Sequence, residues 1–157
     1  MPDFDEVTAI AIEAGLAIMR VYDRGDAIEI TTKGDDSPLT EADLAANEVI
    51  TSGLLAIAPE IPVVSEEGNV GDPKGAPYCW LVDPLDGTKE FIKRNGMFTV
   101  NIALMRKAGD RWKPVFGVVH APVTGITWRG GVSVPACLLY TSPSPRDATL
   151  SRMPSSA

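Results

Sequence analysis

The sequence predicts an α/β fold, an α+β layered sandwich that combines two long helices with a mixed or partly antiparallel sheet. Two segments carry apolar residues at helical spacing, and several short apolar runs between Gly- and Pro-rich turns are typical of strands. The turn at 108–110 joins two of these strands directly, so part of the sheet is expected to be antiparallel. Of the 157 residues, 45% are hydrophobic and 22% charged, which favours one globular domain.

Two helices are expected near the start of the chain. The first covers residues from about 4 to 23, because apolar side chains recur there at helical spacing. These side chains are Val7, Ile10, Ala11, Ala14, Ile18, Val21 and Tyr22. The second begins after Thr40, which forms a capping-box pattern with Asp43, and runs to about residue 58. Its buried side is expected to include Leu44, Ile50, Leu54 and Ile57.

The strands are expected at short apolar runs separated by turns. They cover residues 27–32, 61–64, 79–82, 98–105, 115–119 and 125–129. A turn is expected at 37–39, a loop at 69–77, and a short helical turn ending near Lys93. The single histidine, His120, and Cys79 are interpreted as core residues rather than as reactive groups.

The charge of the chain limits its partners. Fourteen basic against twenty-one acidic residues give a net charge of −7, which argues against nucleic acid or an anionic membrane surface as the main partner. A phosphorylated small molecule is compatible, because bound metal ions can reverse the field of an acidic pocket. No transmembrane segment and no export signal are predicted, so a cytoplasmic location is expected, with peripheral association with the inner membrane left open and the oligomeric state unknown.

The composition changes sharply at Cys137. Residues 137–157 hold five Ser and three Pro and no Gly, a composition typical of a disordered tail. Residues 137–147 also match the translation of DNA that looks like a transposon-based sequencing adapter. We therefore expect a domain over 1–136 and, over 137–157, a disordered segment that is a sequencing artefact.

The chemically informative residues follow two of the expected strands. One strand ends in Asp83, and Asp86 comes three residues later, followed by Gly87 and Thr88 at the start of a helical turn. Carboxylates and a nearby carbonyl suit a hard cation such as Mg²⁺, and an amide at a helix start can face an anion. Glu66, at the end of another strand, could supply a third carboxylate. Taken alone, the motif at 83–88 is as typical of a capped turn as of a metal site, and Glu66-Glu67 is more typical of a solvated strand end.

The motif Asp83-Pro-Leu-Asp-Gly-Thr88 is similar to that of the Mg²⁺-dependent, lithium-sensitive phosphatases that include inositol monophosphatase. The runs 80–96 and 98–104 resemble the 3′(2′),5′-bisphosphate nucleotidase branch, the CysQ type, with Lys89-Glu90-Phe91 as the discriminating piece. Further matches lie at 36–43, 62–67 and 117–122, and Met97 departs from the Glu that this branch often has. The resemblance covers about 4–136 and implies the N-terminal half of the inositol monophosphatase-like fold.

The resemblance implies a metal-assisted hydrolysis of a phosphomonoester. Glu66, Asp83 and the Leu85 carbonyl match the ligands of a first Mg²⁺, and Asp83 bridges to a second that Asp86 also holds. Glu66 and the Thr88 hydroxyl match the pair that orients the attacking water, with Asp43 behind Thr88. The implied substrate contacts are Glu66, Leu85, Asp86 and the amides of Gly87 and Thr88. The implied reaction converts adenosine 3′,5′-bisphosphate to AMP and phosphate, in sulfur metabolism.

The family also has a Trp-Asp motif, whose Asp completes the second metal site, and no such motif follows Arg129 here. We therefore expect the chain as written to lack nucleotidase activity and to leave apolar surface uncovered. Three alternatives stay open: an inositol-phosphate phosphatase, against which Lys89-Glu90 argues, a non-catalytic Mg²⁺- or phosphate-binding module, and an acidic protein-interaction domain supported by net charge alone.

Overall fold

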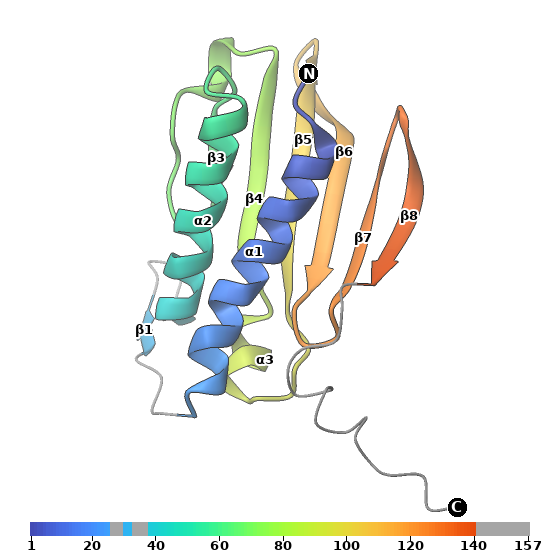
Figure 1. Ribbon diagram of the computed structural model, residues 1–157. Helices are drawn as coiled ribbons and strands as arrows, with labels where there is room; N and C mark the ends of the chain where they lie inside the picture. Colours follow the sequence, from blue (N-terminus) through green and yellow to red (C-terminus); the bar gives the residue numbers. More distant parts are fainter. Residues whose placement is uncertain (26–29, 33–37, 141–157) are drawn as a thin grey trace, which may run out of the picture.

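The computed structural model describes residues 1–25, 30–32 and 38–140, and it arranges them in two layers. One layer is a six-stranded sheet, and the other is a pair of long helices that lie on one face of that sheet (Figure 1). The helices are α1 (Phe4–Asp23), α2 (Glu41–Ile57) and the short α3 (Thr88–Ile92), with a 3-10 turn at Pro73–Gly75. The strands are β1 (Ile30–Thr32), β2 (Pro38–Thr40), β3 (Val63–Ser65), β4 (Tyr78–Asp86), β5 (Thr99–Ala108), β6 (Arg111–Ala121), β7 (Ile126–Gly131) and β8 (Val134–Tyr140).

The sheet is mixed, as the sequence predicts. Its strand order is β3-β4-β5-β6-β7-β8, and β1 pairs with β2 in a separate two-stranded ribbon. Only the β3–β4 pair is parallel, and every later neighbour is antiparallel. Because β3 and β4 run in the same direction, their carboxyl ends lie at the same edge of the sheet.

Both long helices begin at a side-chain cap. Asp3 accepts a hydrogen bond from the amide of Asp5 at the start of α1, and Thr40 and Asp43 form a complete capping box at the start of α2. Helix α1 contacts β5 and β6, and α2 contacts β3 and β4. Helix α2 therefore packs against β3 and β4, the two strands whose carboxyl ends lie at the same edge.

The core fills the space between the helices and the sheet. Trp80, Ile102 and Phe116 are fully buried on the face of the sheet that the helices cover. Near the C-terminal end of α1, the rings of Tyr22, Phe91 and Phe98 pack together with centroids 5.1 to 5.3 Å apart. This cluster anchors α3, and with it the turn that precedes α3, to the end of α1.

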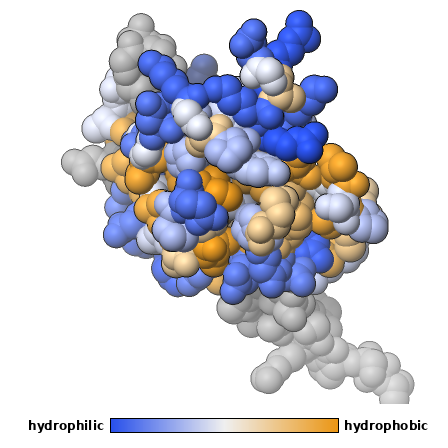
Figure 2. Space-filling view, turned by 90° about the horizontal axis from the view of Figure 1, so that it is seen from above, coloured by the Kyte–Doolittle hydropathy of each residue, from blue (hydrophilic) through white to orange (hydrophobic). Residues whose placement is uncertain are grey.

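The opposite face of the sheet is covered by no helix among the described residues (Figure 1). It exposes the side chains of Leu81, Val119, Trp128 and Leu138, which are 38 to 49% accessible. Seen from above in Figure 2, hydrophobic residues also reach the surface between hydrophilic ones. No helix among the described residues is long and apolar enough to cross a membrane.

The structure corrects several expectations for individual elements. Leu44 is 51% exposed rather than buried, because the buried stripe of α2 runs through Ala42, Ala46, Ile50 and Leu54. Pro38–Thr40 forms strand β2 instead of a turn, since it pairs with β1. Strand β4 continues beyond residue 82 to Asp86, where a loop was expected.

The end of the described chain also differs from expectation. Strand β8 was not expected, yet it pairs with β7 and crosses the boundary drawn at residue 136, so 137–140 are ordered strand rather than disordered tail. Expectations for 27–29, for residue 37 and for 141–157 fall outside the described residues, as do 36–37 of the 36–43 match. Whether the segment from 137 onward belongs to the natural protein stays a prediction.

Candidate functional site

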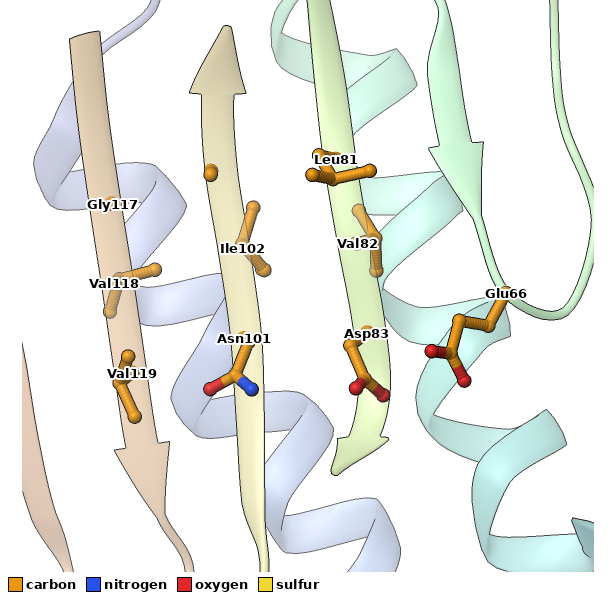
Figure 3. Close-up of a pocket in the computed structure, with 10 residues that line it drawn as sticks. Glu66, Leu81, Val82, Asp83, Asn101, Ile102, Gly117, Val118 and Val119 are labelled. Carbon is orange, nitrogen blue, oxygen red and sulfur yellow. The ribbon is translucent and has the colours of Figure 1, made fainter. Parts of the chain in front are cut away.

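The carboxyl ends of β3 and β4 bring Glu66 and Asp83 to one edge of the sheet. Ser65 pairs with Val82, so the residues that follow, Glu66 and Asp83, are lateral neighbours. The Glu66 amide donates to the Val82 carbonyl at 3.4 Å and fixes this register. Figure 3 shows both carboxylates on the same side of the sheet, beside Asn101 of β5.

A bulge in β4 turns Asp86 toward the same face as Asp83. Asp83 pairs with Asn101 and Asp86 with Thr99, so three steps along β4 match two steps along β5. In a regular strand, residues three apart point to opposite faces, and one extra residue restores them to the same face. Leu85 is buried on the other side, which fixes the direction of the bulge.

Gly87 makes the turn between β4 and α3, and no other residue type fits there. Its φ is +93°, in the left-handed region. A Cβ atom at Gly87 would lie 2.8 Å from the Met97 carbonyl oxygen and 3.3 Å from the Phe98 Cα. The turn is therefore both conformationally and sterically reserved for glycine, and it places Thr88 at the start of α3.

Thr88 is tied to helix α2 through Asp43. The Thr88 hydroxyl lies 3.1 Å from Asp43 Oδ1 and 3.2 Å from the Leu85 carbonyl oxygen, and its one proton can be donated to either. The other oxygen, Asp43 Oδ2, accepts from the Thr40 amide at 2.9 Å and the Thr40 hydroxyl at 2.6 Å. Asp43 is buried and acts as acceptor in all of these bonds, so the capping box that starts α2 also orients Thr88.

One turn further along α2, Asn47 holds the other strand end. The Ser65 hydroxyl donates to Asn47 Oδ1 at 2.6 Å, and the Glu67 amide donates to the same hydroxyl at 3.3 Å. Asp43 and Asn47 are four residues apart, which places them on one face of the helix. Helix α2 thus fixes both ends that carry the carboxylates. Asn47 was not among the expected site residues, although its spacing from Asp43 could have indicated it.

Two polar residues of β5 were also missed. Asn101 Nδ2 donates to Asp86 Oδ2 at 3.1 Å, and the Thr99 hydroxyl donates to Asn101 Oδ1 at 3.1 Å. They alternate with the buried Val100 and Ile102, so they lie on the uncovered face. This alternation was visible in the sequence, but the pairing with β4 was not.

A cavity of about 340 Å³ opens beside these residues on the uncovered face of the sheet. Glu66, Asp83 and Asn101 lie at one end of it (Figure 3), and its remaining walls are mainly apolar residues of β4, β5 and β6. A cavity of this size, apolar with a few convergent polar groups, is typical of a small-molecule site.

The oxygen donors at this edge suit a hard cation, but they are not gathered around one point. Among the described residues, no group of three or more His, Cys, Asp or Glu side chains lies close enough together to hold a metal ion. Glu66 and Asp86 are both exposed, so an ion from solvent can reach their carboxylates. Three carboxylates and the Leu85 carbonyl form the all-oxygen donor set that Mg²⁺ prefers.

His120 and Cys79 lie apart from this site, in agreement with their interpretation as core residues. His120 is buried against Gly15 of α1, and its Nδ1 is 2.8 Å from the Thr127 hydroxyl. Burial lowers the pKa of His120 to about 4, against a smaller opposing effect of the backbone at Ile126. Burial raises the pKa of the Cys79 thiol, which disfavours its reactive thiolate form.

Relatives with similar sequences include proteins named 3′(2′),5′-bisphosphate nucleotidase CysQ. The chain is 52% identical over 130 residues to the 3′(2′),5′-bisphosphate nucleotidase CysQ of Shigella flexneri, covering 79% of this chain and 50% of the relative. The protein of the same name from Haemophilus influenzae is 39% identical, with 79% and 45% covered. The chain spans about half the length of the curated relatives it matches.

Solved structures agree with this similarity. The extragenic suppressor protein suhB of Bartonella henselae superposes with a TM-score of 0.76 at 26% identity, over 86% of this chain and 51% of that one. CysQ of Bacteroides thetaiotaomicron, described as a bacterial member of the inositol monophosphatase family, gives 0.65 at 36% identity, over 92% and 54%.

The family model completes the comparison. The model of the inositol monophosphatase family matches residues 3–152, which is most of the chain and extends past residue 136. Together with the two-layer fold and the CysQ-like sequence, this match confirms the resemblance carried by the motif at 83–88. The chain belongs to the inositol monophosphatase family.

Proposed function

We propose that this chain carries the metal- and phosphate-binding residues of a Mg²⁺-dependent phosphatase that removes the 3′-phosphate of adenosine 3′,5′-bisphosphate, giving AMP and phosphate. The observation that carries the proposal is the bulged end of β4, which presents Asp83 and Asp86 on one face beside Glu66. The Gly87 turn and the Asp43–Thr88 bond then complete one polar edge next to a small-molecule cavity.

The residues that would hold Mg²⁺ are Glu66, Asp83, Asp86 and the Leu85 carbonyl. Their donor atoms are all oxygens, and the side chains of Glu66 and Asp86 are open to solvent. When bound, Mg²⁺ supplies charge neutralisation on the phosphate and lowers the pKa of a coordinated water. The protein's part is to fix these oxygens and to hold the water and the phosphate in line.

Thr88 and Glu66 would orient the attacking water. When the Thr88 hydroxyl donates its proton to Asp43, its oxygen lone pairs remain to accept a hydrogen bond from that water. This arrangement would be favoured if the Leu85 carbonyl held a cation, because that oxygen would then no longer accept the Thr88 proton. Asp43 would therefore act through Thr88 rather than on the substrate.

The phosphate group would lie over the Gly87 turn. Because a Cβ at Gly87 would collide with the backbone, the turn is kept tight, and the amides of Gly87 and Thr88 are the donors assigned to the phosphate oxygens. Glu66, Leu85 and Asp86 complete the proposed substrate contacts at the same edge.

The choice of a nucleotide substrate rests on sequence similarity. The relatives with 52% and 39% identity are named 3′(2′),5′-bisphosphate nucleotidase. Phe91 of the Lys89-Glu90-Phe91 piece is fully buried, so only the two residues before it can distinguish substrates by contact. A role in sulfur metabolism follows from the same substrate.

The proposal is tested with a chimaera. Residues 1–131 of this chain are followed by the corresponding remainder of CysQ from Escherichia coli K12, which is 51% identical over 130 residues. We expect Mg²⁺-dependent phosphate release, with a higher kcat/KM for adenosine 3′,5′-bisphosphate than for inositol 1-phosphate. Asp83→Asn should lower kcat by at least about 100-fold, whereas the 157-residue chain by itself should release no phosphate.

Two results would overturn the proposal. One is a folded chimaera that is inactive toward both substrates, and the other is activity that Asp83→Asn leaves unchanged. A preference for inositol 1-phosphate would keep the phosphatase assignment and reject the nucleotide. Phosphate release by the 157-residue chain, abolished by Asp83→Asn, would show that its residues suffice for catalysis.

A further inference from the structure

A short chain of hydrogen bonds leads from β5 to the carboxylate of Asp86. The Thr99 hydroxyl lies 3.1 Å from Asn101 Oδ1, and Asn101 Nδ2 lies 3.1 Å from Asp86 Oδ2. The register explains why these groups meet. Asp86 pairs with Thr99 across the ladder, and Asn101 is two residues further along the same face.

The chemistry of the groups determines which atom donates in each of these two hydrogen bonds. A carboxylate oxygen accepts hydrogen bonds, so the amide group that faces Asp86 must be the NH₂ end of Asn101. The carbonyl end then faces Thr99, whose hydroxyl is the donor. Reversing the amide would place two acceptors against each other at Asp86. The Asp86 carboxylate therefore selects the orientation in which Asn101 donates to it, and the Thr99 hydroxyl supports that orientation by donating to Asn101 Oδ1.

The position of Asn101 is also informative. It pairs directly with Asp83, so its neutral amide lies beside one carboxylate and donates to the next. Asn101 lines the same cavity as Glu66 and Asp83. A neutral donor at this point holds Asp86 in place without introducing a cation that would compete with a metal ion.

We propose that Asn101, supported by Thr99, is a positioning residue for Asp86: it holds Oδ2 and leaves Oδ1 for a divalent cation. Asp86 is exposed at the end of a bulged strand, and without this bond its carboxylate would rotate freely. This inference rests on the proposed function, since it assigns Asp86 as a metal ligand. Partners that orient metal ligands commonly change metal affinity by about 10- to 100-fold when removed.

The test measures Mn²⁺ binding to the 157-residue chain by electron paramagnetic resonance of the free ion. Asn101→Leu keeps the branched shape and removes the donor, and we expect it to weaken Mn²⁺ binding by about 10-fold or more. Thr99→Val keeps the shape and removes the hydroxyl, and we expect a smaller loss because the amide still donates to Asp86 while its Oδ1 loses the Thr99 donor. Ser52→Ala removes a hydroxyl that donates to the Glu48 carbonyl on the exposed side of α2 and serves as the matched control.

A second readout separates positioning from stability. The thermal midpoint without metal should be nearly the same in the wild type and in Thr99→Val, whereas the upward shift of the midpoint caused by Mn²⁺ should be smaller in the variant. A general structural defect would lower both midpoints equally. If Asn101→Leu fails to fold, Thr99→Val carries the same test.

Asp83→Asn and Asp86→Asn test the metal site separately from the positioning role of Asn101. If these two variants weaken Mn²⁺ binding but Asn101→Leu and Thr99→Val do not, the positioning role is wrong and the metal site stands. If neither Asp variant changes Mn²⁺ binding, the proposed function fails, and the positioning role fails with it.

Discussion

The backbone conformation of Gly87 determines how the residues on either side of it are placed in the site. Its φ of +93° costs a non-glycine residue about 1–2 kcal/mol, and its missing side chain leaves room for the Met97 carbonyl. The turn that it makes sets the separation between Asp86, at the end of β4, and Thr88, at the start of α3.

Three glycine substitutions separate these contributions. Gly87→Ala should lower the free energy of unfolding by about 2–4 kcal/mol, because it meets both the unfavourable φ and the collision with Met97. Gly109→Ala, with φ +63° and open space around it, should lower the free energy of unfolding by about 1 kcal/mol. Gly75→Ala, with open space and no positive φ, should lower it by less than about 0.5 kcal/mol. Urea denaturation measures all three, and equal losses at Gly87 and Gly75 would contradict the steric account.

His120 makes stability depend on pH. Its pKa is about 4 in the folded chain against 6.5 for an ordinary histidine, so below pH 6.5 the unfolded chain takes up a proton that the folded chain does not. Stability should therefore fall as the pH decreases from about 6.5 to about 4, by up to about 3 kcal/mol. Denaturation of the wild type and of His120→Gln at pH 7 and pH 5 measures this. Because His120 is the chain's one histidine, an equal pH dependence in both proteins would refute the account.

At the scale of elements, α2 connects the two strand ends that carry the carboxylates. Asp43 reaches Thr88 beyond β4, and Asn47 reaches Ser65 at the end of β3. The same Asp43 closes the capping box, so the start of the helix and the orientation of Thr88 depend on one buried side chain.

A double-mutant cycle measures this connection. Asp43→Asn should lower the free energy of unfolding by about 2–4 kcal/mol, because its NH₂ group would face donors. Thr88→Val should lower the free energy of unfolding by about 1 kcal/mol. The double variant should lower it by less than the sum of the two single variants, with a coupling energy of about 1–2 kcal/mol. Asp43→Asn combined with Ser52→Ala should be additive, since Ser52 bonds only within α2. Additivity of Asp43→Asn with Thr88→Val would contradict the connection.

The elements themselves were largely predictable from sequence, because their signals are local. The apolar spacing of α1 and the Thr40–Asp43 capping box each lie within a few residues, and both are confirmed. Leu44 was wrongly expected to be buried, because the face that α2 presents is decided by the sheet. Strand β8 was not predicted because its pairing with β7 is visible only in the structure. The Ser- and Pro-rich composition from residue 137 onward suggests a tail instead.

The site was predictable in part for the same reason. The motif from Asp83 to Thr88 is contiguous, and Glu66 follows a strand, so these residues could be named before any contact was known. The spacing of Asn47 from Asp43 was visible, but the contact of Asn47 with Ser65 and that of Asn101 with Asp86 were not, because they join residues 18 and 15 apart along the chain. The bulge that turns Asp86 is likewise visible only against β5.

At the scale of the whole molecule, the uncovered sheet face determines how the chain behaves in solution. Val119 and Trp128 pair across β6 and β7 and are 38% and 45% exposed. A contiguous apolar face of this kind promotes self-association. We expect sedimentation to show a mass that rises with concentration, and Val119→Lys with Trp128→Lys to suppress it. Val132→Lys, at an 82% exposed position in the turn before β8, is the control and should change nothing. A wild type that stays monomeric would contradict this expectation.

The measurement that tests the central claim most directly is the position of Mn²⁺ in crystals of the chain, located by anomalous diffraction. The account predicts a strong peak at the end of β4, with oxygens of Glu66, Asp83, Asp86 and the Leu85 carbonyl as ligands. A peak elsewhere, with this edge of the sheet empty at a Mn²⁺ concentration that saturates binding in solution, would contradict it.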